Sequence, residues 1–282
     1  MWYKRKGNYT DGFKYYKNSI EIVNSKLIER FKALKIPPAY NNVSINSDIK
    51  AKIQAYGYDS KNRKQVIYNT NYIKEQSVKK YERFIRLENQ IEKIKNIILR
   101  DIKSDNIKKK EIGIILFMIL NCGFRIGNEK YVKENNSYGL TTLEFRHLTF
   151  SDNKIFIEFV GKKGVINKSI CNNKIIYKYL LNKKIKANNI GRVFYQSSND
   201  VNNYLKNINP EITSKDLRTW NANNLFLNYM NDEEVLNHKN PIKKSIEKVA
   251  NCLHNTPAIC RKSYLHPELI FIIENKLKND KI

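Results

Sequence analysis

The chain has 282 residues, 41% of them hydrophobic, enough to bury the core of one large or two modest domains and to exclude a disordered chain. Its 52 Lys and Arg residues against 27 Asp and Glu residues give a net charge of +25, which predicts a polyanionic partner. The 18 tyrosines suit phosphate and base contacts, so nucleic acid is favoured over a membrane surface.

The sequence predicts neither a secretory signal nor a membrane-spanning helix. The first seven residues, MWYKRKG, contain no apolar core, so we expect no secretory signal and an intracellular protein. The longest uncharged apolar run, Ile112 to Phe124, is about half of what a bilayer crossing needs. It predicts a buried helix and no membrane association.

The cysteine pattern indicates reduced thiols rather than a metal site. No CxxC pair occurs among the four cysteines, Cys122, Cys171, Cys252 and Cys260. Two of them lie near His254 and His266, but this spacing matches no common zinc pattern. The chain also lacks a GxxxxGK[ST] phosphate loop and clustered carboxylates, so we expect neither a metal nor a nucleotide cofactor.

Residues 1–76 are predicted to form a small β-rich domain. Residues 7–16 have turn and strand composition, and Ile20 to Leu34 has the apolar spacing of a helix that stops before Pro37. Residues 42–45 alternate as a strand, and two further strands flank a turn at residues 60–62. The polar side chains expected on that hairpin to contact DNA are Gln54, Arg63, Lys64, Gln65 and Tyr68. An ordinary solvated hairpin is an equally good interpretation.

Residues 77–282 are predicted to form a larger, mainly helical domain after a linker at 69–75. Apolar residues from Val78 to Ile98 follow a helical period, residues 103–110 break it, and the apolar helix follows. Gly123 and Gly127 give the backbone around Arg125 conformational freedom, so we expect the Arg125 side chain to contact a ligand. Three antiparallel strands are predicted at residues 143–150, 154–160 and 165–170, and further helices at 172–186, 198–207, 215–230, 242–254 and 267–279.

The stretch around Tyr264 is the strongest candidate for chemistry. Thr256 and Pro257 predict the N-cap and first residue of a short helix, which would carry Tyr264 about two turns along. Arg261 and Lys262 place positive charge beside that phenol. A single tyrosine near the end of a chain is more often a packing or surface residue, so a catalytic role for Tyr264 has to be judged from the rest of the sequence.

Six ordered segments give the chain a close resemblance to the small type IB DNA topoisomerases of viruses and bacteria, the poxvirus-like family. Two lie in the amino-terminal part, residues 36–45 (IPPAYNNVSI) and 52–65 (KIQAYGYDSKNRKQ). The others are residues 122–129 (CGFRIGNE), 159–164 (FVGKKG), 215–220 (KDLRTW) and 255–264 (NTPAICRKSY). The resemblance implies an α+β protein, in which a helical catalytic domain with a short antiparallel sheet follows the β-rich domain.

The resemblance also implies roles for five residues. Tyr264 would attack a DNA phosphodiester to give a 3′-phosphotyrosyl bond, Arg125 and Arg218 would hold the charge on the phosphate oxygens, and Lys162 would protonate the leaving 5′ oxygen. Lys163 is the adjacent competitor and a DNA-contact candidate, like Arg261 and Lys262. In many relatives a His contacts the phosphate at a position nine residues before the tyrosine. In this chain that position is Asn255, whose amide can also donate a hydrogen bond. His254, the preceding residue, remains an alternative.

The implied activity is relaxation of supercoiled double-stranded DNA without ATP, by a monomer that closes on the duplex as a clamp. Such a protein would be found with DNA in a bacterial or host cytoplasm or in a virion. A tyrosine recombinase shares this chemistry, but its second arginine usually follows a HisxxArg pattern, whereas Lys215 stands before Arg218 here. A non-catalytic DNA-packaging protein would explain the charge but not the ordered catalytic set.

Overall fold

A computed structural model describes residues 1–279. The chain forms two compact units, Met1–Lys80 and Tyr81–Ile282, and the division between them falls inside helix α2 (Thr70–Glu88). No helix within the described residues is both long and apolar enough to span a bilayer. The predicted α+β class is confirmed, whereas independent domains at 1–76 and 77–282 stay a prediction.

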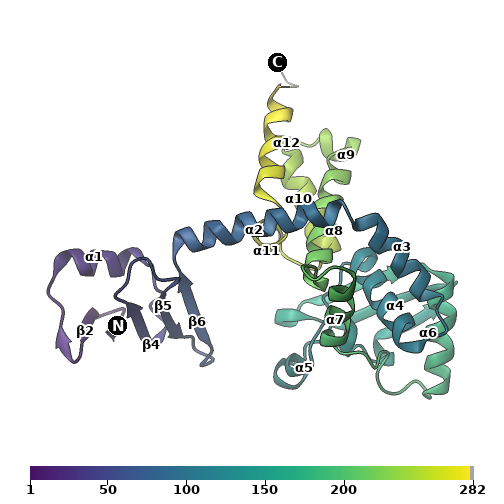
Figure 1. The fold of residues 1–282 in the computed structure, drawn as a ribbon, viewed down its shortest axis with the longest axis horizontal. Coiled ribbons are helices and arrows are strands. Elements are labelled where there is room, and N and C mark those ends of the chain that lie inside the picture. The colour runs from purple at the N-terminus through teal and green to yellow at the C-terminus, as the bar shows by residue number, and fades with distance from the viewer. Residues whose placement is uncertain (280–282) are drawn as a thin grey trace. The chain divides into compact units, whose positions relative to one another are not determined.

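The first unit is built on a six-stranded antiparallel sheet in the order β3-β2-β1-β4-β5-β6 (Figure 1). Its elements are β1 (Trp2–Asn8), β2 (Gly12–Lys17), β3 (Ile20–Glu21), α1 (Ser25–Ala33), β4 (Asn41–Asn46), β5 (Ile53–Tyr58) and β6 (Lys64–Tyr68). Phe31 of α1 is buried among Tyr15, Val43, Ile45 and Ala55 of the strands, so one face of the sheet and the helix share a core. The predicted strands at 42–45 and around the turn at 60–62 are confirmed.

Two predictions in this unit are wrong at helix starts. Residues 20–34 were expected to be one helix, but α1 begins at Ser25, because the side chain of Asn24 accepts the N–H of Leu27 at 3.1 Å. Residues 69–75 were expected to be a linker, but α2 begins at Thr70. There Asn69 supplies its side-chain oxygen to the N–H of Asn71 at 2.8 Å and its carbonyl to Ile73.

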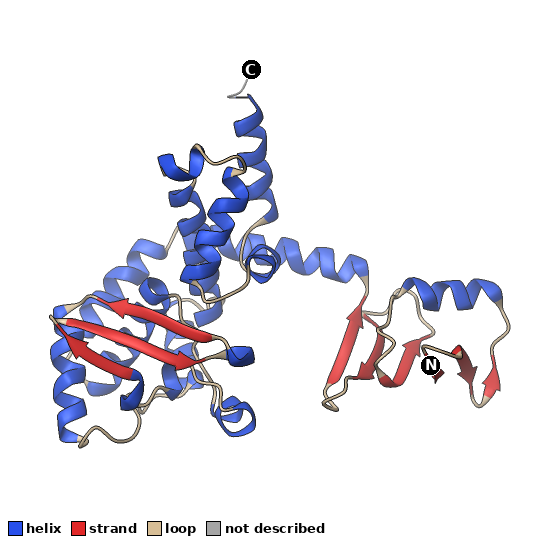
Figure 2. Cartoon of the chain, turned by 180° about the vertical axis from the view of Figure 1, so that it is seen from behind, coloured by secondary structure: helices blue, strands red, loops and turns tan. Residues whose placement is uncertain are grey.

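The second unit combines helices with a three-stranded antiparallel sheet in the order β7-β8-β9 (Figure 2). Its strands are β7 (Leu148–Ser151), β8 (Lys154–Val160) and β9 (Ile166–Cys171). The helices that follow α2 are α3 (Ile91–Ile102), α4 (Ile107–Cys122), α5 (Glu129–Asn135), α6 (Lys174–Lys186), α7 (Ser198–Ile208), α8 (Ser214–Tyr229), α9 (Glu233–Leu236), α10 (Pro241–Cys252), α11 (Pro257–Ser263) and α12 (Pro267–Asn279). The helices predicted at 172–186, 198–207, 215–230, 242–254 and 267–279 are all present, with their ends shifted by a few residues.

Helix α8 contributes to both hydrophobic clusters of this unit. The larger cluster surrounds α4, whose residues are buried on nearly all sides, and includes Leu217 and Trp220 of α8. The smaller cluster packs Ala222 and Phe226 of α8 against α10, α11 and α12. Burial on two sides fixes α8, and this matters because it carries Arg218.

The structure of this unit differs from the sequence predictions in three places. The stripe from Val78 to Ile98 is two helices, separated at Asn89 and Gln90. In the first predicted strand, 143–150, residues Phe145–His147 form a 3-10 turn and only the last three residues enter β7. Helices α5 and α9 were not predicted; each is short and begins at a side-chain cap, Asn128 or Asp232.

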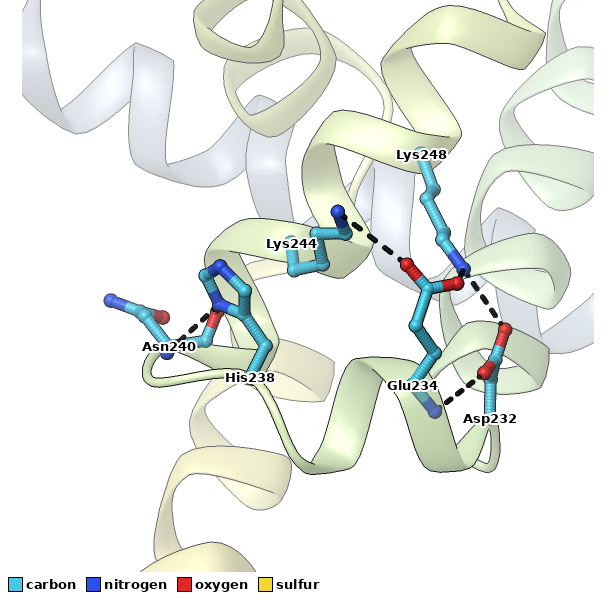
Figure 3. A network of polar contacts seen from close by, with 6 residues as sticks. All are labelled: Asp232, Glu234, His238, Asn240, Lys244 and Lys248. Atoms are coloured by element: carbon cyan, nitrogen blue, oxygen red, sulfur yellow. Dashed lines mark hydrogen bonds and ion pairs between the residues drawn. The ribbon is translucent and has the colours of Figure 1, made fainter.

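Ion pairs hold α9 to α10 (Figure 3). The ammonium of Lys248 lies 3.1 Å from Asp232 and 2.8 Å from Glu234. His238, in the loop between these helices, accepts the N–H of Asn240 at 3.0 Å, and Asn240 caps α10. These contacts fix the start of the helix whose last residue, Cys252, leads into the candidate site.

Candidate active site

Four of the predicted site residues are linked by contacts in the second unit: Arg125, Arg218, Asn255 and Tyr264. They come from the segment after α4, from α8, from the loop after α10, and from the residue that follows α11. The chain thus joins four segments that lie up to 139 positions apart, between Arg125 and Tyr264.

Gly123 brings the Arg125 segment against the Asn255 loop. It ends α4 in the left-handed conformation, with φ of 65°. A β-carbon at this position would overlap the carbonyl oxygen of Cys252, so only glycine allows the two segments to come this close. As a result, Nη2 of Arg125 donates a hydrogen bond to Oδ1 of Asn255.

Arg218 is a buried cation at the centre of the site. It is 3% exposed, its Nη2 donates to the carbonyl of Leu253, and its guanidinium carbon lies 4.9 Å from the centre of the Tyr264 ring. Burial lowers the pKa of Arg218 to about 10; the Tyr264 phenol acts in the opposite direction, and the charge of Arg125 lowers it further. At neutral pH the side chain is still cationic.

Three buried donors in this cluster have no hydrogen-bond partner within the described residues. They are Nε and Nη1 of Arg218 and Nδ2 of Asn255. Buried N–H groups are nearly always paired in folded proteins, because leaving one unpaired costs about 1–3 kcal/mol. Two of these donors belong to a cation, so the group that would satisfy them is an anion with several acceptor oxygens.

Tyr264 is held by its backbone. Thr256 caps α11 by accepting the N–H of Ile259 at 3.3 Å, as predicted, but the helix ends at Ser263 and Tyr264 is the residue immediately after it. The tyrosine is 8% exposed. Its side chain therefore lies against Arg218 with little freedom.

Asn223 is a residue that sequence reasoning missed. It is 1% exposed on α8, and its amide nitrogen donates to the carbonyls of Thr219 at 2.8 Å and Tyr264 at 2.9 Å. Its oxygen accepts the N–H of His266 at 2.9 Å. Helix α8, which carries Arg218, thus binds the backbone at both Tyr264 and His266. An Asn among the apolar residues of a helix was the available signal.

His254 contacts the segment at the end of α4. Its Nε2 lies 3.2 Å from the carbonyl oxygen of Cys122, and its ring stacks on Phe124 with centroids 5.0 Å apart. Burial lowers the pKa of His254; the Cys122 carbonyl acts against this, and Arg218 and Arg125 add to it. This geometry supports Asn255 over His254 as the phosphate contact.

Lys162 is not brought to the four-residue cluster. It lies exposed at the tip of the β8–β9 turn, and no described contact joins it to Arg125, Arg218 or Tyr264. Lys163, also exposed, has left-handed backbone with φ of 65°. Gly161 at the base of the turn packs so closely on Asn167 that a β-carbon would overlap its amide. The base of this turn is thus constrained, while the lysines extend into solvent.

Gln54 does not suit the DNA contact that was expected of it. It is 5% exposed, its amide nitrogen donates to the carbonyls of Asp48, Ile49 and Ala51, and its oxygen accepts from Arg30 at 3.0 Å. A side chain with every polar atom bonded inside the protein has none to offer a base. Gln54 instead holds the loop between β4 and β5.

Of the other side chains expected on the hairpin, Arg63, Lys64 and Tyr68 are exposed and Gln65 is half-buried. Arg63 and Gln65 both contact Asp59, whose pKa is lowered to about 2, chiefly by the Arg63 hydrogen bond. Lys64 lies over the Tyr56 ring at 4.1 Å. Tyr68 is 40% exposed, and its ring lies 5.5 Å from that of Tyr72, measured between centroids.

The two basic residues before Tyr264 do not join its cluster. Arg261 lies 3.6 Å from Glu274 of α12, and Lys262 is exposed. Both remain candidates for DNA phosphate contacts. Among residues 1–279, no group of three His, Cys, Asp or Glu side chains is arranged to hold a metal ion.

Comparison with known proteins covers nearly the whole chain. The family model described as "Eukaryotic DNA topoisomerase I, catalytic core" matches residues 60–281. The one described as "Bacterial DNA topoisomerase IB, N-terminal domain" matches residues 12–59. The chain is 30% identical to the DNA topoisomerase 1B of Acanthamoeba polyphaga mimivirus, over 93% of this chain and 84% of that protein. It is 29% identical to the DNA topoisomerase 1 of rabbit fibroma virus, over 91% and 86% of the two chains, and 28% identical to the vaccinia virus enzyme (strain Copenhagen), over 78% and 72%.

Proposed function

The chain belongs to the type IB DNA topoisomerases, and from this premise we propose how its residues divide the reaction. A type IB enzyme relaxes supercoiled DNA by cutting one strand, letting it rotate and rejoining it. The observation that carries the assignment is three buried donors with no partner among residues 1–279, two on Arg218, which lies beside the Tyr264 ring, and one on Asn255. A phosphodiester in transfer has the charge and the oxygens that those donors require.

Tyr264 is the proposed nucleophile. Its phenolic oxygen bonds to phosphorus, the bond from phosphorus to the 5′ oxygen breaks, and the phenolic proton leaves to solvent. The product is a 3′-phosphotyrosyl diester and a free 5′-hydroxyl. Religation reverses each step, with the 5′-hydroxyl displacing the tyrosine. One phosphodiester replaces another, so the bond energy is conserved and ATP has no step to drive.

Arg218, Arg125 and Asn255 are proposed to stabilise the charge on the non-bridging oxygens. The two free donors of Arg218 and Nδ2 of Asn255 supply hydrogen bonds in a site where burial excludes water. Arg125 orients the Asn255 amide by occupying its oxygen, which leaves the nitrogen for the phosphate. Because an amide does not titrate, this contact is independent of pH near neutrality.

Lys162 is proposed as the acid that protonates the departing 5′ oxygen. Its exposed position at the tip of the β8–β9 turn means that the turn must bring the ammonium to the scissile bond when DNA is bound. Such a requirement would make protonation depend on correct seating of the duplex. Lys163, its neighbour, is assigned a phosphate contact.

Double-stranded DNA is the substrate, and we propose that a monomer binds it with both units as a clamp. The net charge of +25 supports binding dominated by phosphates. The exposed hairpin residues Arg63, Lys64 and Tyr68 of the first unit and the half-buried Gln65 are proposed to contact the duplex, as are Arg261 and Lys262 of the second. The comparisons give no support to a recombinase or a packaging protein.

The decisive experiment is relaxation of a supercoiled plasmid in EDTA without nucleotide, with the covalent adduct trapped by denaturation. We expect full relaxation and an adduct on the 3′ phosphate that Tyr264→Phe abolishes with DNA affinity retained. Tyr195→Phe, which changes a tyrosine that is 74% exposed, is the matched control and should behave as wild type. An adduct on a 5′ phosphate, or one that survives Tyr264→Phe, refutes the assignment.

A further inference from the structure

His254 forms a second connection between the segments that carry Arg125 and Asn255. It is the residue before Asn255, and the carbonyl that it contacts belongs to Cys122, the last residue of α4. A carbonyl oxygen can only accept, so Nε2 of a neutral His254 is the donor. The same two segments are thus connected twice, by the Cys122–His254 contact and by the Arg125–Asn255 hydrogen bond.

The backbone of His254 shows that this arrangement is imposed by its surroundings. Its φ is 51°, in the left-handed region that few residues other than glycine adopt without cost. Stacking on Phe124 and the hydrogen bond to Cys122 hold the ring in place. The reversal of the chain at His254 turns the next residue, Asn255, toward Arg125 instead of toward solvent.

We propose that His254 is a positioning residue for the cleavage reaction: its hydrogen bond to the Cys122 carbonyl fixes the loop so that the Asn255 amide meets Arg125 and presents Nδ2 to the phosphate. This inference depends on the proposed role of Asn255. Nε2 of His254 is engaged by the Cys122 carbonyl, so the proposed role requires no contact of His254 with the phosphate. Its effect on catalysis passes through Asn255 alone.

Two substitutions that differ by one methylene group isolate the hydrogen bond. His254→Gln places an amide nitrogen near the position of Nε2, whereas the amide of His254→Asn is too short to reach the Cys122 carbonyl. Both lose the stacking on Phe124 equally, and Asn tolerates the left-handed backbone well. His238→Asn is the matched control, because His238 is exposed in the loop between α9 and α10 (Figure 3).

The measurement is the single-turnover cleavage rate at saturating enzyme, with DNA affinity and melting temperature recorded for each variant. We expect His254→Asn to cleave about tenfold more slowly, the effect of one hydrogen bond, and His254→Gln to stay within about threefold of wild type. DNA affinity should change by less than about twofold in both, because phosphate contacts dominate binding. The control should match wild type in cleavage rate and DNA affinity.

A double-mutant cycle separates this inference from the function proposed above. Asn255→Ala alone tests the role of Asn255, and an unchanged cleavage rate would remove that role whatever His254 does. If Asn255→Ala does slow cleavage, adding His254→Asn should cost less than about twofold more, since the residue that His254 positions is gone. A full tenfold loss in that background, equal rates for His254→Gln and His254→Asn, or no loss in His254→Asn overturns the proposal.

Discussion

Changing Asn223 to Asp tests whether α8 holds the nucleophile in place. The substitution keeps the shape of the side chain and the acceptor for the His266 N–H, but it replaces the amide donor that bonds the carbonyls of Thr219 and Tyr264. An ionised carboxylate cannot donate, so the two carbonyls would face a negative oxygen. Only the protonated carboxyl restores one of the two bonds.

The magnitude follows from the cost of that proton. A carboxyl with an ordinary pKa of about 3.9 needs about 5 kcal/mol to stay protonated at pH 7.5, which is the largest loss of unfolding free energy to expect. Burial raises the pKa of the introduced carboxyl in the folded state, so the penalty is absent below about pH 4 and grows as pH rises. The slope is about 1.4 kcal/mol for each pH unit until the raised pKa is reached.

Urea unfolding between about pH 4.5 and pH 8 measures this slope relative to wild type. Asn228→Asp, an exposed position on the same helix, is the control and should cost only a few tenths of a kcal/mol. Cleavage by Asn223→Asp should be slower by about 10²-fold at neutral pH, because the released backbone lets Tyr264 move. Unchanged stability and an unchanged cleavage rate at pH 7.5 would refute the idea that Asn223 fixes the nucleophile.

Four further predictions test the remaining parts of the site. Lys162→Ala should slow cleavage severely and be rescued by a substrate with a 5′-thiol leaving group, which departs without a proton; no rescue would remove its role as acid. Asn255→Ala should reduce the cleavage rate by about 10²-fold and leave DNA affinity nearly unchanged, as measured in single-turnover assays. Affinity should fall steeply between about 50 and 200 mM salt, and a flat response in a binding titration would contradict phosphate-dominated contacts. Gln54→Ala should lower the melting temperature of the first unit, because it removes four internal hydrogen bonds, yet leave the salt dependence of DNA binding unaltered.

The sequence predicted the elements best where a periodic apolar pattern coincides with a cap. Thr256 and Pro257 mark the start of α11, and the alternation of residues 154–160 matches β8 without error. It failed where one side chain decides the local structure. Asn69 converts an expected linker into the first turn of α2, and Asn24 delays α1 until the chain has passed Ile20 and Val23, which are 73% and 87% exposed.

The site shows the same limit. Motif order identified five residues as a set. The fold brings Arg125, Arg218, Asn255 and Tyr264 together, whereas Lys162 lies exposed on the β8–β9 turn. The partners that position them could not be predicted, because contacts such as that between Asn223 and Tyr264 join residues 41 positions apart. Gln54 illustrates the opposite error, since a polar residue in a strand gives no sign that a loop folds over it.

The shared origin of Arg218 and Asn223 on α8 has a mechanical consequence. Arg218 contacts the Tyr264 ring, and Asn223 binds the Tyr264 backbone. Both sides of the Arg218–Tyr264 contact are therefore attached to the same helix. If α8 shifts, we expect the Arg218 guanidinium and the Tyr264 ring to move together, which would preserve the 4.9 Å between them. Such coupling would let the second unit change shape as DNA binds while it keeps the alignment proposed for rejoining.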